Sequence, residues 1–108
     1  MLVFGNAFSV NMLKRRASVS FVEAELWEVK QWLSEEKEFL SIIGHKGTAD
    51  LLSVKLGTQI PVNRVNYKLK EGDSLIICLP TQRLEEGKIL TKDELESIEV
   101  KFWLAELN

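Results

Sequence analysis

The chain contains very few of the residues that build disulfides and zinc sites. It has one cysteine and one histidine among 108 residues. A single cysteine cannot form an internal disulfide, and no Cys/His cluster of the kind that binds zinc is present. We therefore expect no metal site and no cofactor, in a reducing, cytoplasmic environment. In such a protein Cys78 is expected to be a small buried hydrophobic residue.

Long apolar runs and an excess of positive charge are also missing. No stretch approaches the ~20 apolar residues that span a bilayer, and no segment resembles a secretory signal. The net charge is −2 at pH 7, so the chain lacks the general positive field with which proteins hold duplex DNA. We expect no membrane contact, and an anionic ligand would have to be held by local charges.

Motifs of the large nucleotide-binding and hydrolase families are absent as well. The chain has neither a Walker nor a Rossmann glycine loop. No nucleophile elbow supports Ser-His-Asp hydrolysis. Any chemistry must therefore rest on other groups.

The residues that are present fit one α+β domain. A hydrophobic content of 45% with 28% charged residues is ordinary for a small globular protein. Alternation and short apolar runs predict strands at residues 2–5, 18–23, 60–70, 74–80 and 100–107, and the brief apolar run at 39–44 can form a further short strand. Helical spacing predicts helices at residues 24–36, 46–56 and 92–97. We therefore expect a single domain over residues 1–108, with one mixed sheet of about five strands and three short helices.

Some of these elements carry boundary signals. Gly57 is a natural stop for the helix at 46–56, and Thr91 with Glu94 forms a capping-box pattern that opens the helix at 92–97. Residues 74–80, SLIICLP, are continuously apolar, which predicts a central strand covered on both faces. The tryptophans are expected in the core or in a dimer interface: Trp27, Trp32 and Trp103.

The only histidine lies in the stretch SIIGHKGTADLL, at the start of a predicted helix. Histidine is the type of side chain whose ordinary pKa lies nearest to neutral pH, which suits proton transfer. A helix that begins near Lys46 offers free N–H groups to a phosphate, and Gly44 and Gly47 allow a ligand to come close. The pattern is compatible with a phosphate site and a general acid. A plain polar or capping role for His45 is the alternative.

Other polar residues are candidates for ligand contacts. Arg83 in TQRLEEGKIL can grip a phosphate with two hydrogen bonds, and Glu86 or Glu85 can orient that arginine; a solvated charged loop is the alternative. Asn6, Ser9 and Asn11 follow the first strand, where they could read a base edge or a ribose hydroxyl or simply form a turn. Arg64 begins the predicted strand at 60–70, where a solvated role is the alternative.

Four segments together resemble one family. They are N-A-F-S-x-N-M-L at 6–13, I-G-H-x-G-T-A at 43–49, L-G-x-x-I-P-V-N-R at 56–64 and R-L-x-E-G-K-x-L at 83–90. Their order and spacing are similar to those of the viral and mobile-element type III anti-CRISPR ring nucleases, which were long a domain of unknown function. The resemblance covers essentially the whole chain, which looks most like a bacterial member.

The resemblance implies a function. Ring nucleases of this family are homodimers that bind cyclic tetra-adenylate across the two-fold interface. They cut it without a metal into linear di-adenylate, because a ribose 2′-hydroxyl attacks the neighbouring phosphodiester and leaves a 2′,3′-cyclic phosphate. This suppresses type III CRISPR signalling.

The resemblance also implies roles for residues. The family histidine matches His45 and protonates the departing 5′-oxygen, while Arg83 and Glu86 match the residues that support the phosphate and the transition state. The ligand contacts that the resemblance implies are Asn6, Ser9 and Arg64, and we expect Asn11, Gly44 and Thr48 to contact the ligand as well.

Three other functions remain open from the sequence. The chain could bind a cyclic nucleotide without turnover. It could be a small DNA-binding regulator of a mobile element, although its charge is negative and no helix-turn-helix accompanies the basic run Lys14-Arg15-Arg16. It could also be a structural protein whose dimer interface is its main feature.

Overall fold

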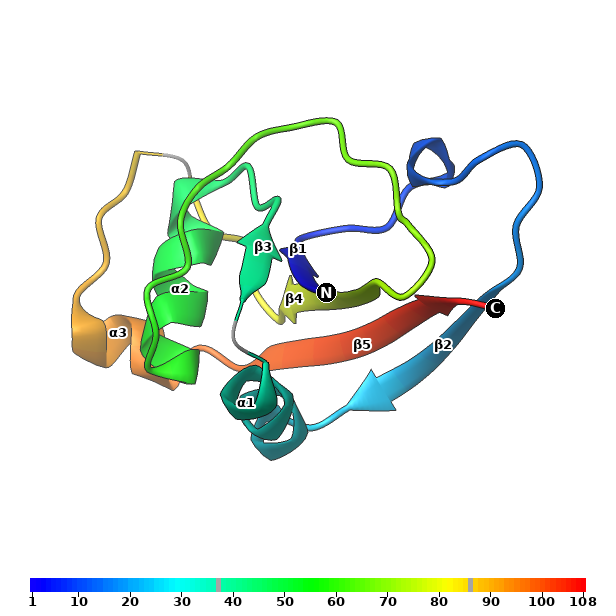
Figure 1. Cartoon of the computed structure of the whole chain (residues 1–108). Coiled ribbons are helices and arrows are strands. Elements are labelled where there is room, and N and C mark those ends of the chain that lie inside the picture. Colours follow the sequence, from blue (N-terminus) through cyan, green and yellow to red (C-terminus); the bar gives the residue numbers. More distant parts are fainter. Residues whose placement is uncertain (37, 86) are drawn as a thin grey trace.

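A mixed five-stranded sheet lies at the centre of the molecule (Figure 1). The computed structural model describes residues 1–36, 38–85 and 87–108. The strands run in the order β2-β5-β4-β1-β3. Their bounds are β1 Leu2–Gly5, β2 Val19–Ala24, β3 Phe39–Ser41, β4 Ser74–Pro80 and β5 Val100–Leu107. β1 pairs in parallel with β3 and β4, whereas β5 pairs antiparallel with β4 and β2. The expected α+β fold with a mixed sheet is confirmed.

The helices begin and end close to the predicted positions. They are η1 Val10–Met12, α1 Leu26–Glu35, α2 Lys46–Leu56 and α3 Lys92–Ser97. Gly57 ends α2 in the left-handed conformation with φ 66°, which glycine adopts without a steric cost. Thr91 caps α3: its hydroxyl accepts the Glu94 N–H at 3.2 Å, and the Glu94 carboxylate accepts the Thr91 N–H at 3.0 Å. These hydrogen bonds lower the pKa of Glu94.

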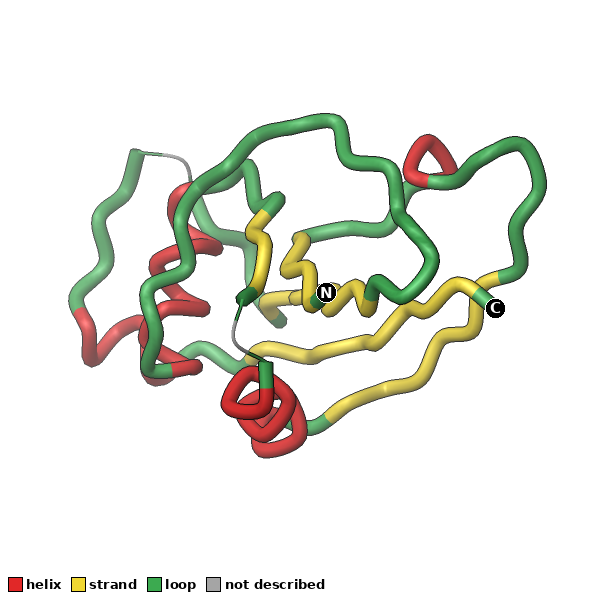
Figure 2. The backbone as a smooth tube through the Cα atoms, viewed as in Figure 1, coloured by secondary structure: helices red, strands yellow, loops and turns green. Residues whose placement is uncertain are grey.

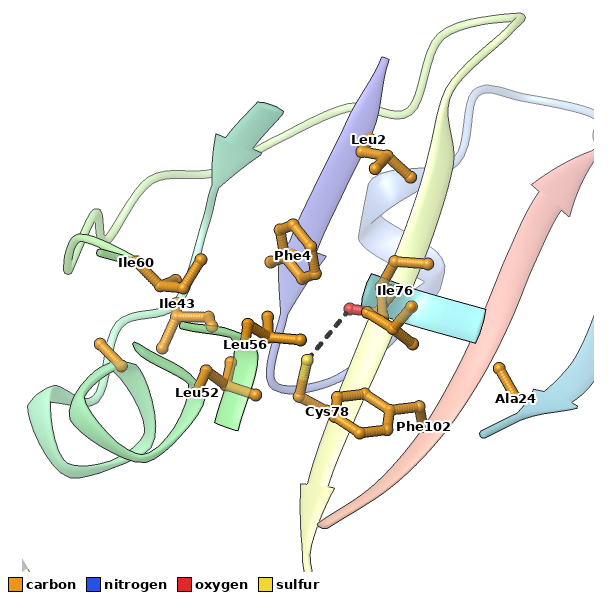
Figure 3. Close-up of a cluster of buried hydrophobic side chains, with 12 residues drawn as sticks. Leu2, Phe4, Ala24, Ile43, Leu52, Leu56, Ile60, Ile76, Cys78 and Phe102 are labelled. Carbon is orange, nitrogen blue, oxygen red and sulfur yellow. Dashed lines mark hydrogen bonds between the residues drawn. The ribbon is translucent and has the colours of Figure 1, made fainter. Parts of the chain in front are cut away.

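One face of the sheet is covered by α1 and α2. Phe4, Cys78 and Phe102 from the strands pack there against Val29 of α1 and Leu52 of α2 (Figure 3). Cys78 is fully buried and its thiol donates to the Ile76 carbonyl at 3.6 Å. Burial raises the pKa of this thiol, so Cys78 is the inert hydrophobic residue that the sequence predicts.

The other face is covered by irregular segments and by the short 3-10 helix η1 rather than by α-helices. Figure 2 shows residues 57–73 as a long loop, with a second loop following β1. These loops contribute Leu69, Tyr67 and Phe8 to a second apolar cluster around Val3 and Leu75 of the sheet. The loops that carry candidate ligand contacts are therefore part of the core packing.

The predicted strand at 60–70 is wrong. Residues 60–70 have no strand pairing, and the apolar side chains do not alternate between buried and exposed positions: Ile60 and Leu69 are deeply buried, whereas Val62 and Val65 between them are 47% and 50% exposed. Pro61 has no N–H to give to a ladder, and the neighbouring β3 is three residues long. A continuous ladder therefore cannot form there.

Individual hydrogen bonds hold this loop in place of a ladder. Asn63 donates its backbone N–H to the Ile43 carbonyl and its side-chain amide to the Ser41 carbonyl, both at 2.8 Å. The Ser41 hydroxyl donates to the Pro61 carbonyl at 2.6 Å. The loop is thereby tied to the end of β3, next to His45.

A second anchor lies at the other end of the same loop. The Tyr67 hydroxyl donates to Asp73 Oδ2 at 2.6 Å, and the Lys70 N–H donates to the same oxygen at 3.0 Å. The N-terminal ammonium lies 3.7 Å from Asp73 Oδ1. Desolvation, the hydrogen bond to Asp73 and the charge of Asp73 raise the pKa of Tyr67 to about 12.

The tryptophans divide between core and surface. Trp32 and Trp103 pack against the two clusters on either side of the sheet, which confirms a core role for both. Trp27 is 65% exposed and is not part of the core; its place in a dimer interface stays a prediction.

No described helix is long and apolar enough to cross a membrane.

We expect Tyr67→Phe to reduce the free energy of unfolding by about 1 kcal/mol near neutral pH, because it removes one hydrogen bond to a buried carboxylate. The neutral phenol is the form that the fold favours. Its contribution is therefore complete below pH 10 and is lost as the pH rises towards the raised value of about 12.

The difference in stability between wild type and Tyr67→Phe should shrink over that alkaline window, as measured by urea unfolding. Tyr67 is the single tyrosine, so the absorbance of tyrosinate reports its ionisation directly. Titration of the folded protein at the ordinary value of 10 would contradict the anchor.

Candidate functional site

The ends of three parallel strands bring the candidate residues together. Asn6 directly follows β1, His45 follows β3, and Arg83 follows β4. β1 lies between β3 and β4 and is parallel to both, so the carboxyl ends of all three strands lie at one edge of the sheet. In open sheets with parallel strands, ligands bind outside the carboxyl ends of the strands. Segments far apart in the sequence are thus assembled by strand pairing alone.

His45 is the N-cap residue of α2. Its backbone is extended, with φ −115° and ψ 120°. Its Nδ1 accepts the backbone N–H of Thr48 at 3.2 Å and lies 3.3 Å from the Thr48 hydroxyl. An acceptor role for Nδ1 puts the proton of the neutral ring on Nε2. His45 therefore caps the helix, as the alternative interpretation of the sequence predicts. Because the cap uses Nδ1, Nε2 stays available to a ligand.

Two glycines allow the side chains around His45 to approach. A Cβ on Gly47 would lie 2.9 Å from His45 Cε1 and 3.2 Å from Nδ1, and a Cβ on Gly44 would lie 3.2 Å from both Cγ and Nε of Arg64. The Arg64 side chain therefore crosses directly over Gly44. The loop at 57–73 delivers this cation to the residue before His45, although the two are far apart in the sequence.

Arg83 shares a pocket with His45. Both residues line a pocket of about 650 Å³ together with Leu84 and Glu85. Leu84 also packs against the small cluster that joins α2 to α3, around Leu51. This apolar contact positions the exposed Arg83 beside the N-terminus of α2. Glu86, the other predicted catalytic residue, lies outside the described residues.

Asn6, Ser9 and Asn11 line a separate pocket of about 510 Å³. The Ser9 hydroxyl accepts the Asn11 N–H at 3.2 Å, so Ser9 caps η1 as the turn interpretation predicts. The Lys68 ammonium donates to the Asn11 carbonyl. Ile42, which follows β3, lines the same pocket, so this pocket adjoins the segment that leads to His45.

The sequence did not single out every residue near these pockets. Lys68, Asn66 and Tyr67 line the pocket with the two asparagines and Ser9, and Lys88 lines a further pocket of about 240 Å³ beside Arg83 and Gly47. Lys68 was not identified because residues 60–70 were predicted to form a strand. Lys88 lies inside the R-L-x-E-G-K segment, but the sequence pattern assigned no role to its charge.

Thr48 is predicted as a ligand contact, but its polar atoms in the structure meet His45. The residue is 6% exposed, and both its N–H and its hydroxyl lie at His45 Nδ1.

Positive charge around the histidine comes from Arg64 and Arg83, while Lys46 pairs with Asp50 at 2.7 Å. Over residues 1–36, 38–85 and 87–108, no three His, Cys, Asp or Glu side chains cluster as metal ligands would.

Comparison with known proteins places the chain in a family. A family model described as STIV B116-like matches residues 2–102. The chain belongs to this family. The solved structure of B116 of Sulfolobus turreted icosahedral virus (STIV) matches with a TM-score of 0.79 and 31% sequence identity, and the match covers 97% of each chain. The five-stranded α+β fold is therefore that of a B116-like protein.

Relatives in sequence come from viruses and from a bacterium. The uncharacterized protein 26 of Sulfolobus islandicus filamentous virus is 40% identical over 86 residues, which cover 79% of this chain and 72% of the relative. The uncharacterized protein YddF of Bacillus subtilis is 36% identical over 91 residues, which cover 81% of this chain and 84% of the relative. The resemblance to a viral family is thereby confirmed at the level of the B116-like family.

We expect Gly47→Ala to displace the His45 ring, because the new methyl group would lie 2.9 Å from Cε1. The lost cap costs about 1 kcal/mol, and alanine in place of glycine in a helix returns about the same amount. The free energy of unfolding should therefore change little, while the Thr48 amide should exchange faster with deuterium.

Lys55→Ala in the last turn of α2 is the matched control, because it lies far from the cap and should leave the Thr48 amide unchanged. An unchanged Thr48 exchange rate in Gly47→Ala would show that the ring does not depend on this glycine.

Proposed function

We propose that this B116-like protein is a metal-independent ring nuclease that cleaves cyclic tetra-adenylate and so suppresses type III CRISPR signalling. The observation that carries the proposal is the assembly of His45, Arg83 and Asn6 at the carboxyl ends of β3, β4 and β1. The choice of cyclic tetra-adenylate as the substrate rests on the sequence resemblance. The position of His45 and Arg83 in one pocket supports this chemistry.

The chemistry needs one proton donor and a means of holding the substrate. The 2′-oxygen of a ribose attacks the adjacent phosphorus in line and loses its proton to solvent. The bond from phosphorus to the 5′-oxygen breaks, leaving a 2′,3′-cyclic phosphate. The departing 5′-oxygen takes a proton from Nε2 of the His45 imidazolium. The nucleophile belongs to the substrate, so the protein supplies orientation and acid catalysis.

The charges around His45 suit a phosphodiester. Arg83 lines its pocket and Arg64 crosses the preceding glycine, so two different loops bring an arginine to the segment that carries His45. The N-terminus of α2 adds free N–H groups, which favour an anion. The same helix end disfavours an imidazolium, and a bound phosphate offsets that cost. Substrate binding therefore favours the protonated acid.

A homodimer fits a substrate that repeats. A ring of four identical nucleotides has the symmetry to meet two copies of each side chain across a two-fold axis. Two copies would also double the arginines presented to a tetra-anion by a chain whose own net charge is −2. The pocket with Asn6, Ser9 and Asn11 provides amide and hydroxyl groups suited to adenine or ribose.

The first test is incubation of purified protein with cyclic tetra-adenylate in the presence of EDTA, followed by chromatography of the products. We expect wild type to yield linear di-adenylate with a 2′,3′-cyclic phosphate. His45→Ala should reduce the rate by on the order of 10²–10⁴ and the free energy of unfolding by about 1 kcal/mol, because the helix cap is also lost.

His45→Asn separates these two roles, because asparagine is a good N-cap residue without an acidic ring proton. This variant should keep the stability of wild type and lose the activity. Binding without cleavage by wild type would instead indicate a sensor or sponge for the nucleotide. Absence of binding would contradict the proposal, and a salt-dependent gel-shift assay would then test whether the protein binds DNA.

A further inference from the structure

Thr48 contacts His45 through two groups of different chemistry. Its backbone N–H can donate a hydrogen bond and cannot accept one, whereas its hydroxyl can do both. The N–H lies 3.2 Å and the hydroxyl oxygen 3.3 Å from the same atom, His45 Nδ1. Because Thr48 is 6% exposed, water has little access to replace either contact.

The two protonation states of His45 make opposite demands on this contact. In the neutral ring Nδ1 is an acceptor, and the Thr48 N–H satisfies it as a helix cap. In the imidazolium both ring nitrogens carry protons, so Nδ1 needs an acceptor and faces the Thr48 N–H, which offers none. A general acid must pass through the charged state, so a purely backbone cap would work against the proposed reaction.

We propose that the Thr48 hydroxyl is a positioning group that accepts a hydrogen bond from Nδ1 of protonated His45, so that the ring keeps its place in both states. This inference rests on the proposed function. The hydroxyl lets the ring exchange one partner for the other within the same residue, and Nε2 keeps its direction toward the substrate. Thr48 thus acts through His45 and does not need to touch the ligand.

Gly47 is a second part of the same arrangement. The absence of its side chain leaves room for Cε1 and Nδ1 of the ring, which lie 2.9 and 3.2 Å from the place of a Cβ. The ring is therefore packed directly over the first turn of α2. A rotation that carried Nδ1 away from Thr48 would also carry the ring out of this contact.

Among the described residues, charged side chains near the N-terminus of α2 come from three segments. They are Lys46 and Asp50 of α2, Arg64 of the loop at 57–73, and Arg83, Glu85 and Lys88 of the segment after β4. Substitution of Thr48 changes none of these side chains. A comparison of Thr48 variants therefore isolates the hydroxyl from the surrounding field.

The test compares wild type, Thr48→Val and Thr48→Ser by NMR titration of the His45 ring protons in the free protein. His45 is the single histidine, so its signals are unambiguous. Valine keeps the shape and the backbone N–H and removes the hydroxyl. We expect its titration midpoint to fall by roughly 0.5–1 pH unit, because the imidazolium loses its acceptor, while the neutral tautomer stays protonated on Nε2.

The same variants are then assayed for cleavage of cyclic tetra-adenylate across pH. Thr48→Val should lower kcat roughly 3- to 10-fold on the alkaline side of the profile, in step with the shifted midpoint, and should change KM little. Thr48→Ser should restore both the midpoint and the rate. Thermal unfolding of each variant checks that the fold is intact.

An unchanged midpoint in Thr48→Val, or a serine variant that behaves like the valine variant, would overturn the inference. A purely structural Thr48 would lower the unfolding temperature and leave the titration where it is. Failure of wild type to cleave would overturn the proposed function, and with it the catalytic part of the inference, while the titration would still show whether the hydroxyl stabilises the charged ring.

Discussion

The parallel pairing of β1 with β3 on one side and with β4 on the other is the interaction on which the site depends. Each of these strands ends at the same edge of the sheet, and each is followed by polar residues that do not meet in the sequence. The strands themselves are buried and apolar, so the hydrophobic effect holds the edge together. The polar groups at the edge are thereby positioned without having to stabilise the fold.

Much of the remaining geometry is set by loops that also close the core. Residues 57–73 bury Leu69 and fix their two ends through Asn63 and Asp73, and the middle carries Arg64 over Gly44. A loop that is bonded to β3 through Asn63 and closed on itself around Asp73 is far less free than its lack of regular structure implies. Such anchoring gives an arginine a defined position, which a solvated loop would not do.

The sequence predicted the helices, their caps and most strands, because these depend on local signals: Gly57 and Thr91 mark helix ends, and the apolar run at 74–80 marks the central strand. It was wrong at 60–70, where Pro61 and a short neighbouring strand prevent pairing that the alternation suggested. The position of Arg64 over Gly44 was not predictable, because it depends on which loop packs against which strand end, and local patterns carry no such information. The contact of Thr48 with His45 is local, three residues along the chain, and belongs to the capping role that the sequence left open.

The pairing of β1 with β4 also bears on how the protein is made. Residues 2–5 pair with residues 74–77, so the first strand leaves the ribosome long before its central partner does. Contacts this distant in the chain form only after a large loss of loop entropy, which slows folding. Until then the apolar strand near the N-terminus lacks its cover. A nascent or shortened chain that stops before residue 74 would contain Asn6 and His45 beside the β1–β3 pair, yet would lack the central strand β4 and, with it, Arg83.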